Sequence, residues 1–196
     1  MSQEDEEVAH NLSPNKKWIK KISQDQPVFF QNYSRKDSFH LVANVKKDES
    51  NKRNTVIIFE PVISKEELEK KNEWLYLITI NDSIVKIGGT RTGLKGRFSS
   101  YISGHHTKER GKTGDCSKTN AFVYNTLDFY IQLGYEVKVY GYKIPKVALV
   151  IEVLDENVEI SPQMYHIYES KFLEDYKRTY SKYPQLSSNC DPEYKK

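Results

Sequence analysis

Residues 74–101 read WLYLITINDSIVKIGGTRTGLKGRFSSY, and this stretch decides the fold of the chain. Its first half contains two short runs of apolar and β-branched residues, at 75–80 and 84–88, and such runs are typical of strands. The residues between them, 81–83, are Asn-Asp-Ser, which favour tight turns because their side chains hydrogen bond to the local backbone. The stretch therefore predicts a β-hairpin.

A short helix is predicted directly after this hairpin. Gly88 and Gly89 end the second strand, and the pattern of residues 94–102 favours a helix because every fourth residue is apolar: Leu94, Phe98 and Ile102. Four polar side chains are then expected to converge where the hairpin meets the helix: Tyr76, Lys86, Arg97 and Tyr101.

These four residues resemble the signature of the GIY-YIG nuclease superfamily. In that family one strand carries GIY, the next carries YIG, and an arginine follows on the first helix, with an aromatic residue or histidine one turn later. Here residues 74–76 are WLY, residues 86–88 are KIG, and Arg97 stands in the place of the helix arginine, with a tyrosine four residues further on. Trp74 replaces the first glycine, and Lys86 replaces the second tyrosine, as in the restriction-endonuclease branch of the family.

The resemblance also implies a glutamate on a later helix, and Glu169 is the candidate. A final helix is predicted at about 161–178, and at 100° per residue Glu169 falls inside its apolar and aromatic face, whereas Glu174 falls outside. A carboxylate on a buried face is costly unless it is paired or bound to a cation. Pairing with Arg97 or Lys86, or a position at the edge of the face, would be structural; the resemblance favours a metal ligand.

The chemistry that the resemblance implies is phosphodiester hydrolysis with one Mg²⁺ per active site. Glu169 would hold the metal, which keeps most of its waters. Arg97 would bind the scissile phosphate through its planar guanidinium, and Tyr76 would accept the proton of the attacking water. Lys86 would favour the phenolate of Tyr76, and Tyr101 would contact the phosphate or share the proton relay. Each residue also has an ordinary structural interpretation, because strand tyrosines usually pack and helix arginines are usually solvated.

Further candidate contacts lie outside the motif. The segment 91–118 is locally basic and rich in Gly, Ser and Thr, which suits contact with a phosphate backbone, although a solvated loop has the same composition. The candidate DNA-binding residues in it are Arg91, Lys95, His105, Lys108, Arg110, Lys112 and Lys118. After the last helix, the resemblance adds Asn189 as a candidate near the metal site.

Composition excludes several classes of protein. The 196 residues are 37% hydrophobic and 29% charged, as in a globular protein, and no apolar run approaches the ~18 residues of a membrane span. The acidic start MSQEDEEVAH has no apolar core, so we expect no secretory signal. Two cysteines without a CxxC motif predict neither a disulfide framework nor a zinc site, and we expect a cytoplasmic, reducing location. The net charge of +3 is too small to decide the partner.

The remaining segments predict an arm ahead of the motif and a compact domain around it. The expected division is a disordered acidic start at 1–14, an accessory arm at 15–72 for DNA contact or dimerisation, a nuclease domain at 73–190 and a tail at 191–196. The expected strands are 28–30, 39–45, 55–59, 135–142 and 146–154, the last two as a pair, and the further helices are 65–71 and 119–133.

The sequence thus predicts an α+β fold, with a small central mixed sheet flanked by helices and a β-rich arm before it. The favoured hypothesis is a Mg²⁺-dependent endonuclease for double-stranded DNA, a type II restriction enzyme that acts as a homodimer on a short duplex site. A homing-type or repair nuclease of the same family is an alternative within the class. A non-catalytic nucleic-acid-binding protein on the same scaffold is the alternative from another class.

Overall fold

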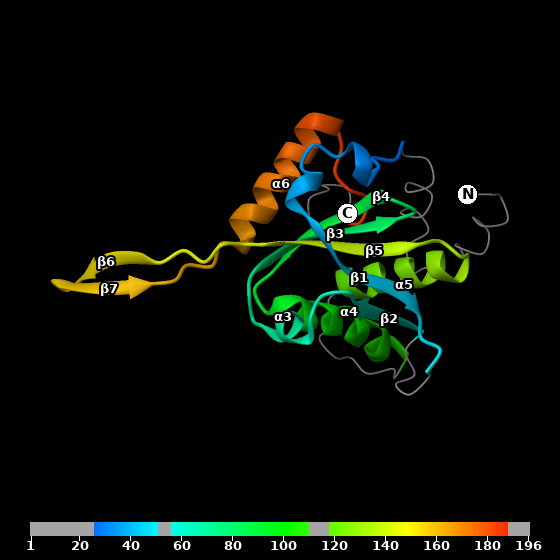
Figure 1. The fold of residues 1–196 in the computed structure, drawn as a ribbon, viewed down its shortest axis with the longest axis horizontal. Coiled ribbons are helices and arrows are strands. Elements are labelled where there is room, and N and C mark those ends of the chain that lie inside the picture. Colours follow the sequence, from blue (N-terminus) through cyan, green and yellow to red (C-terminus); the bar gives the residue numbers. More distant parts are fainter. Residues whose placement is uncertain (1–25, 51–55, 110–117, 188–196) are drawn as a thin grey trace.

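The structure is a computed structural model, and it describes residues 26–50, 56–109 and 118–187, with the backbone alone considered at 104–109 and 118. Five strands form one antiparallel sheet in the order β2-β1-β5-β3-β4 (Figure 1). Its strands are β1 (His40–Lys47), β2 (Ile57–Pro61), β3 (Trp74–Ile80), β4 (Ser83–Thr90) and β5 (Val137–Lys143). The expected α+β fold with a small central sheet is confirmed, and every pair in the sheet is antiparallel rather than mixed.

Helices cover both faces of this sheet. On one face lie α4 (Gly93–Glu109) and α5 (Lys118–Gln132), with the short α3 (Lys65–Glu69) beside α4. The other face is covered by α6 (Tyr165–Tyr180), which contacts β3 and β4, and by two short 3-10 turns, η1 (Phe30–Asn32) and η2 (Lys36–Ser38) (Figure 1). Within the described residues, no helix is long and apolar enough to cross a membrane.

The hairpin forms as the sequence predicts. Asn81 and Asp82 have φ of 43° and 65°, the left-handed conformation that two-residue hairpin turns require and that Asn and Asp tolerate. The register pairs Tyr76 with Gly88 and Ile78 with Lys86. Paired residues point to the same face of a sheet, so both Tyr76 and Lys86 are directed to the face that carries α4.

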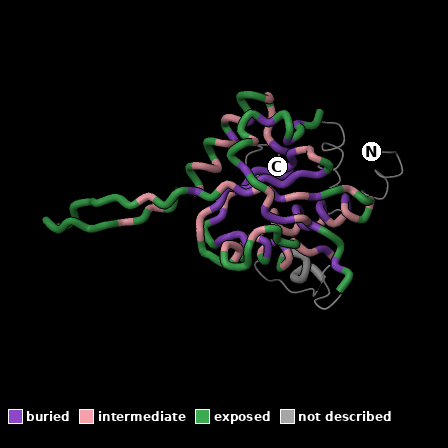
Figure 2. The backbone as a smooth tube through the Cα atoms, viewed as in Figure 1, coloured by how far each residue is buried: buried purple, intermediate pink, exposed green. Residues whose placement is uncertain are grey.

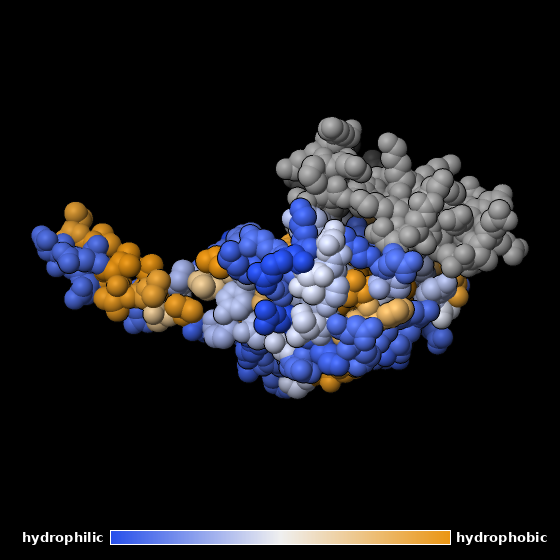
Figure 3. All heavy atoms as spheres, turned by 90° about the horizontal axis from the view of Figure 1, so that it is seen from above, coloured by the Kyte–Doolittle hydropathy of each residue, from blue (hydrophilic) through white to orange (hydrophobic). Residues whose placement is uncertain are grey.

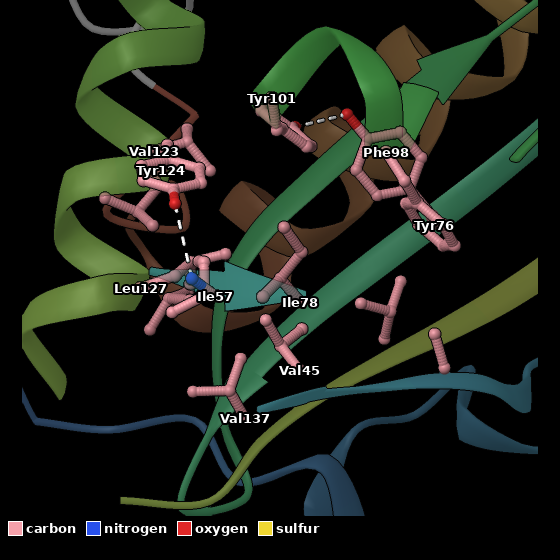
Figure 4. Close-up of a cluster of buried hydrophobic side chains, with 14 of the residues drawn as sticks. Val45, Ile57, Tyr76, Ile78, Phe98, Tyr101, Val123, Tyr124, Leu127 and Val137 are labelled. Carbon is pink, nitrogen blue, oxygen red and sulfur yellow. Dashed lines mark hydrogen bonds between the residues drawn. The ribbon is translucent and has the colours of Figure 1, made fainter. Parts of the chain in front are cut away.

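The core on the α4 and α5 face holds the aromatic residues of the motif. Trp74, Tyr76 and Tyr101 are almost fully buried there, among side chains of β1, β3, α4 and α5 (Figures 2 and 4). The Tyr124 hydroxyl of α5 accepts a hydrogen bond of 3.3 Å from the backbone N–H of Ile57, which ties this helix to strand β2. The opposite face packs Leu75 and Leu77 of β3 against α6.

Strands β1 and β2 belong to the central sheet. Within the stretch 15–72, predicted as an accessory arm, β1 pairs with β5, and β2 extends the sheet at its edge. Alternation of apolar residues identified a strand near 39–45, but a local pattern does not say which distant strand completes its hydrogen bonds. A role of this segment in DNA contact or dimerisation stays a prediction.

The predicted pairing of 135–142 with 146–154 is wrong. Strand β5 lies between β1 and β3, while β6 (Leu149–Val153) pairs with β7 (Glu156–Ile160) in a separate two-stranded ribbon. The physical reason is the tight turn after Val153, which lets β6 fold back on the next residues of the chain. This ribbon projects from the body of the molecule (Figure 1).

Most predicted helices form, with shifted ends. The helix predicted at 94–102 extends as α4 to Glu109, and the helix predicted at 119–133 is α5. The last helix begins at Tyr165 rather than at 161, so Ser161 and Pro162 belong to the segment between β7 and α6. The strand predicted at 28–30 is a single bridge from Phe29 to Ser83 followed by a 3-10 turn.

Candidate functional site

Three polar side chains of the motif meet in one hydrogen-bonded group. The hydroxyl oxygens of Tyr76 and Tyr101 lie 2.7 Å apart. Arg97 donates from Nε to the Tyr76 hydroxyl at 2.7 Å and from Nη2 to the Tyr101 hydroxyl at 3.1 Å. Tyr76 comes from β3 and the other two from successive turns of α4, so the helix fixes the arginine against a rigid strand. We call Tyr76, Arg97 and Tyr101 the tyrosine–arginine group.

Burial and the neighbouring charges shift the pKa values of this group in opposite directions. Burial raises the pKa of Tyr76 above its usual value, and the Arg97 guanidinium lowers it only in part. Burial also raises the pKa of Tyr101, well above its usual value. Burial alone would lower the pKa of Arg97, but the two tyrosine hydroxyls raise it on balance. The group at rest is therefore an arginine cation held by two neutral phenols.

Gly88 makes this arrangement possible. It pairs with Tyr76 across the hairpin, and the tyrosine ring lies directly over its backbone. A Cβ at Gly88 would lie 2.6 Å from Tyr76 Cζ and would also collide with the hydroxyl oxygen. The glycine predicted from the motif is thus explained by the close approach of a side chain.

Lys86 makes a different contact from the one expected. Its Nζ donates a hydrogen bond of 2.9 Å to the backbone carbonyl of Leu186, and the side chain is buried. The cation that donates to the Tyr76 hydroxyl is Arg97. A short segment at 184–187, which we call the C-terminal strap, runs along β4: Leu186 N–H donates to the Val85 carbonyl at 2.7 Å.

Ser187 completes the strap. Its Oγ accepts from Ile87 N–H at 3.2 Å and donates to the Ile87 carbonyl at 3.1 Å. The described part of the strap therefore covers the free edge of β4 as far as Ile87. Sequence reasoning missed the strap, because its contacts join residues a hundred positions apart and no local pattern indicates such a pairing.

Glu169 lies over the second glycine. A Cβ at Gly89 would lie 3.0 Å from Glu169 Oε2 and 2.9 Å from Tyr165 Cδ2, so both side chains of α6 approach the bare backbone. Successive residues of a strand face opposite sides, which puts the tyrosine–arginine group against Gly88 and Glu169 against Gly89. The two groups are close enough to interact, since the negative charge of Glu169 adds to the rise in the pKa of Tyr76.

The Glu169 carboxylate is a single acidic group rather than part of a cluster. It is half-buried, and among the residues that the structure describes it makes neither a hydrogen bond nor an ion pair. The same described residues contain no cluster of three or more His, Cys, Asp or Glu side chains that could together hold a metal ion. A cation here would have one protein carboxylate and water as ligands, which is usual for Mg²⁺.

The predicted basic contacts are only partly described. Arg91 is exposed and donates to Gln163 Oε1 at 3.4 Å, and Lys95 forms an ion pair of 2.8 Å with Glu69. The remaining candidates lie outside the described residues or have side chains that are not described: His105, Lys108, Arg110, Lys112, Lys118 and Asn189.

A basic cavity near Arg91 was not predicted. It has a volume of about 270 Å³, and the described side chains that line it include the cations Lys71, Arg91 and Lys146 and the acidic Glu73. A second cavity of about 470 Å³ continues from it, sharing Ile144 and Lys146, and adds further lysines. These cations come from three separate segments, so no local run of charge in the sequence could have indicated them.

The fold is similar to those of two solved nucleases. No protein-family model and no curated protein sequence matches the chain. The structure of restriction endonuclease HPY188I in complex with product DNA aligns with a TM-score of 0.52 and 22% identity over 85% of this chain and 88% of that one. The structure of a mutant of bacteriophage T4 EndoII aligns with a TM-score of 0.52 and 19% identity over 76% of this chain and 96% of that one. The chain therefore shares the fold of these two proteins.

Proposed function

We propose that the protein is a DNA endonuclease of the GIY-YIG type that hydrolyses phosphodiester bonds. The observation that carries the proposal is the hydrogen-bonded tyrosine–arginine group placed across two bare glycines from Glu169. Phosphoryl transfer needs positioned positive charge and a proton acceptor, and these residues are suited to both tasks. The fold shared with two nucleases supports the same conclusion.

Arg97 is the member of the group that a phosphate can reach first. It is partly exposed, whereas Tyr76 is 1% and Tyr101 0% exposed. A guanidinium has five N–H donors in a plane, so after bonding the two hydroxyls it retains donors for phosphate oxygens. A phosphate bound by these remaining donors would lie beside the Tyr76 hydroxyl while Arg97 keeps its contact with it.

Tyr76 would act as the base in its phenolate form: its own phenol proton first leaves to solvent, and the phenolate oxygen then accepts the proton of the attacking water. Its pKa is raised in the free protein, so it needs the nearby cation to act as a base. Arg97 supplies that charge at 2.7 Å. Tyr101 is hydrogen-bonded to the same oxygen and can pass the proton on. Lys86 binds the Leu186 carbonyl of the strap and so serves as a positioning residue for β4.

Glu169 would hold one Mg²⁺ through a carboxylate oxygen. The residues fit this role, because the carboxylate has no hydrogen-bond partner among the described side chains and faces the space that a Cβ at Gly89 would fill. When bound, such a metal stabilises negative charge on the phosphate and on the leaving oxygen.

The basic cavity would bind the DNA backbone beside the cut. Lys71, Arg91 and Lys146 line it, and phosphate contacts of this kind contribute affinity that falls as salt rises. We propose a type II restriction enzyme acting on double-stranded DNA, because the chain has one such site and cutting both strands then needs two copies. A homing-type or repair nuclease would share the site but not the requirement for a short palindrome.

The test is plasmid cleavage in the presence of Mg²⁺, comparing wild type with Glu169→Gln. Glu174→Gln is the matched control, since Glu174 lies on the same helix and forms an exposed ion pair with Lys171. We expect discrete fragments from wild type and from the control, and a loss of at least about 10²-fold in rate for Glu169→Gln, with DNA binding retained. If wild type binds DNA but leaves many substrates intact with Mg²⁺ or Mn²⁺, the protein is a non-catalytic binding protein instead.

A further inference from the structure

The ribbon of β6 and β7 has one mainly apolar face and one more polar face. Residues directly opposite each other point the same way, so the pairs Leu149–Ile160 and Ile151–Val158 form the mainly apolar face together with Val153 and its partner Glu156 near the tip. The other face carries the pairs Val150–Glu159 and Glu152–Asn157. Figure 3 shows hydrophobic residues gathered along this projecting ribbon.

This apolar face is exposed in the single chain. Leu149, Ile151, Val153 and Val158 are each about 38–46% exposed, whereas core strand β3 has every residue buried. A two-stranded ribbon is marginally stable by itself, and an apolar face on a projecting element is typical of an interaction surface. Among the described residues, no further layer therefore covers this face of the ribbon.

The tip of the ribbon is also apolar. Leu154 is 93% exposed and has φ of 52°, and Asp155 has φ of 64°. Asn and Gly usually occupy such turn positions, because a larger side chain is strained at positive φ. A leucine that is both strained and exposed at the tip is explained by a contact with another surface.

The charge of the ribbon disfavours DNA as its partner. The segment from Leu149 to Ile160 contains four acidic residues and no lysine or arginine: Glu152, Asp155, Glu156 and Glu159. Phosphates of a nucleic acid or of an anionic lipid surface would be repelled by it. The partner is therefore a protein surface with an exposed apolar area.

We propose that the ribbon is the dimerisation element and that its partner is a second copy of this chain. The inference rests on the proposed function, which needs two active sites on one duplex, and it identifies the surface that joins them. A two-fold contact buries the same face on both copies, so one ribbon supplies its own complement. Two ribbons packed face to face and running in opposite directions bring each tip to the root of the other ribbon.

The base of the ribbon, where β7 leads into α6, offers a contact for the tip. Helix α6 begins at Tyr165, shortly after β7 ends, and Ile167 in its first turn is 54% exposed. Ile167 of the second copy would meet Leu154 of the first, and the symmetric contact would repeat the arrangement. One two-fold interface thus accounts for the exposed face, the exposed tip and the exposed isoleucine.

The size of the surface predicts a weak dimer. Each strand of five residues is about 17 Å long at ~3.3 Å per residue, and two strands with their side chains are roughly 10 Å wide. The stacked faces therefore cover on the order of 170 Å² per copy, well below the ~600 Å² per partner of a small specific interface. We expect dissociation in the micromolar range without DNA and a tighter dimer when both copies bind one duplex.

The test is the molar mass of the full chain, measured by analytical ultracentrifugation without DNA over a range of concentrations. The first variant is Ile151→Lys, which places a charge in the apolar face. Val150→Lys is the matched control, because Val150 lies next to Ile151, is more exposed at 68% and belongs to the other face. We expect a monomer–dimer equilibrium for wild type and for the control, and at least about tenfold weaker association for Ile151→Lys. Thermal unfolding of each variant checks that the fold is intact.

Three results would overturn the proposal. They are a wild type that stays monomeric up to several hundred micromolar, a dimer that Ile151→Lys leaves unchanged, and a dimer that both variants weaken equally. Because this measurement uses no DNA and no metal, it is independent of the cleavage assay. A protein that cuts DNA but never dimerises refutes the ribbon proposal alone, and a dimer without nuclease activity refutes the proposed function alone.

Discussion

Replacing Gly88 by alanine should disable the site without replacing any of its polar side chains. The new Cβ would lie 2.6 Å from Tyr76 Cζ, whereas carbon atoms in contact are normally about 3.5–4.0 Å apart. The tyrosine ring must therefore move by about 1 Å, since Gly88 is in the middle of a strand pair and its backbone is held on the β3 side. A shift of this size stretches the 2.7 Å contacts of the Tyr76 hydroxyl with Arg97 and Tyr101 beyond hydrogen-bonding distance.

The expected loss of stability has two parts. Overpacking a core site costs about 1–3 kcal/mol. Loss of the hydrogen bond between the Arg97 guanidinium and the Tyr76 hydroxyl costs about 1.5–3 kcal/mol. The sum of about 2.5–6 kcal/mol corresponds to a fall in Tm of roughly 5–24 °C for a chain of this size. Turnover should fall by on the order of 10²-fold, because a reacting group displaced by about 1 Å loses that much.

Gly141→Ala separates the effect of overpacking the core from the effect of displacing the Tyr76 hydroxyl. Gly141 pairs with Tyr76 from β5, and a Cβ there would lie 2.8 Å from Val42 Cγ1 and 3.1 Å from Trp74, so it overpacks the same core without meeting the hydroxyl. Differential scanning calorimetry and plasmid cleavage, both with folded protein, should show reduced stability for both variants and reduced turnover for Gly88→Ala alone. A Gly88→Ala variant with wild-type turnover would refute the role assigned to the position of Tyr76.

Three further outcomes follow from single contacts. Ser187→Ala should lower the free energy of unfolding by about 1–3 kcal/mol in urea titration, because it leaves the buried backbone groups of Ile87 without partners; an unchanged midpoint would show that the strap is not needed. Tyr124→Phe should cost a similar ~1–3 kcal/mol by removing the acceptor for the Ile57 N–H, with DNA cleavage unaffected below the melting transition. Burial raises the folded pKa of Tyr101, so its contribution to stability is complete below pH ~10, the unfolded pKa, and is lost as the pH rises above that value. The Tm of wild type should therefore fall more steeply than that of Tyr101→Phe above pH ~10, and parallel curves would contradict this assignment.

The sequence contains enough information to predict the centre of the site. The hairpin turn, the glycines and the helix arginine are encoded by neighbouring residues within 74–101, and each depends on local backbone geometry or on a short period. The placement of Glu169 on the packed side of the last helix follows from the 3.6-residue period alone, and the structure has this residue half-buried over Gly89.

Local sequence patterns of this kind do not predict which distant segments of the chain pair with each other. The alternation in β5 is the same whether it joins β1 and β3 or its neighbour β6, and only the whole set of strand contacts decides. The same limit explains Lys86: its position on the face of Tyr76 could be predicted, but its acceptor, the Leu186 carbonyl, carries no side-chain signal. The lysines of the basic cavity come together for a similar reason, since strand and helix packing brings Lys71 and Lys146 beside Arg91.

In the proposed nuclease, the two glycines would let groups on opposite faces of one sheet act on one ligand. A side chain at either position would separate Arg97 from Glu169 by a layer of atoms, because neighbouring residues of a strand cover opposite faces. Because Gly88 and Gly89 have no side chains at the end of edge strand β4, the Tyr76 ring and the Glu169 carboxylate lie directly against the backbone. A phosphate at this edge could therefore meet the guanidinium from one face while the carboxylate approaches from the other. The diglycine thus shapes the site as much as the charged residues do, although it contributes no functional group.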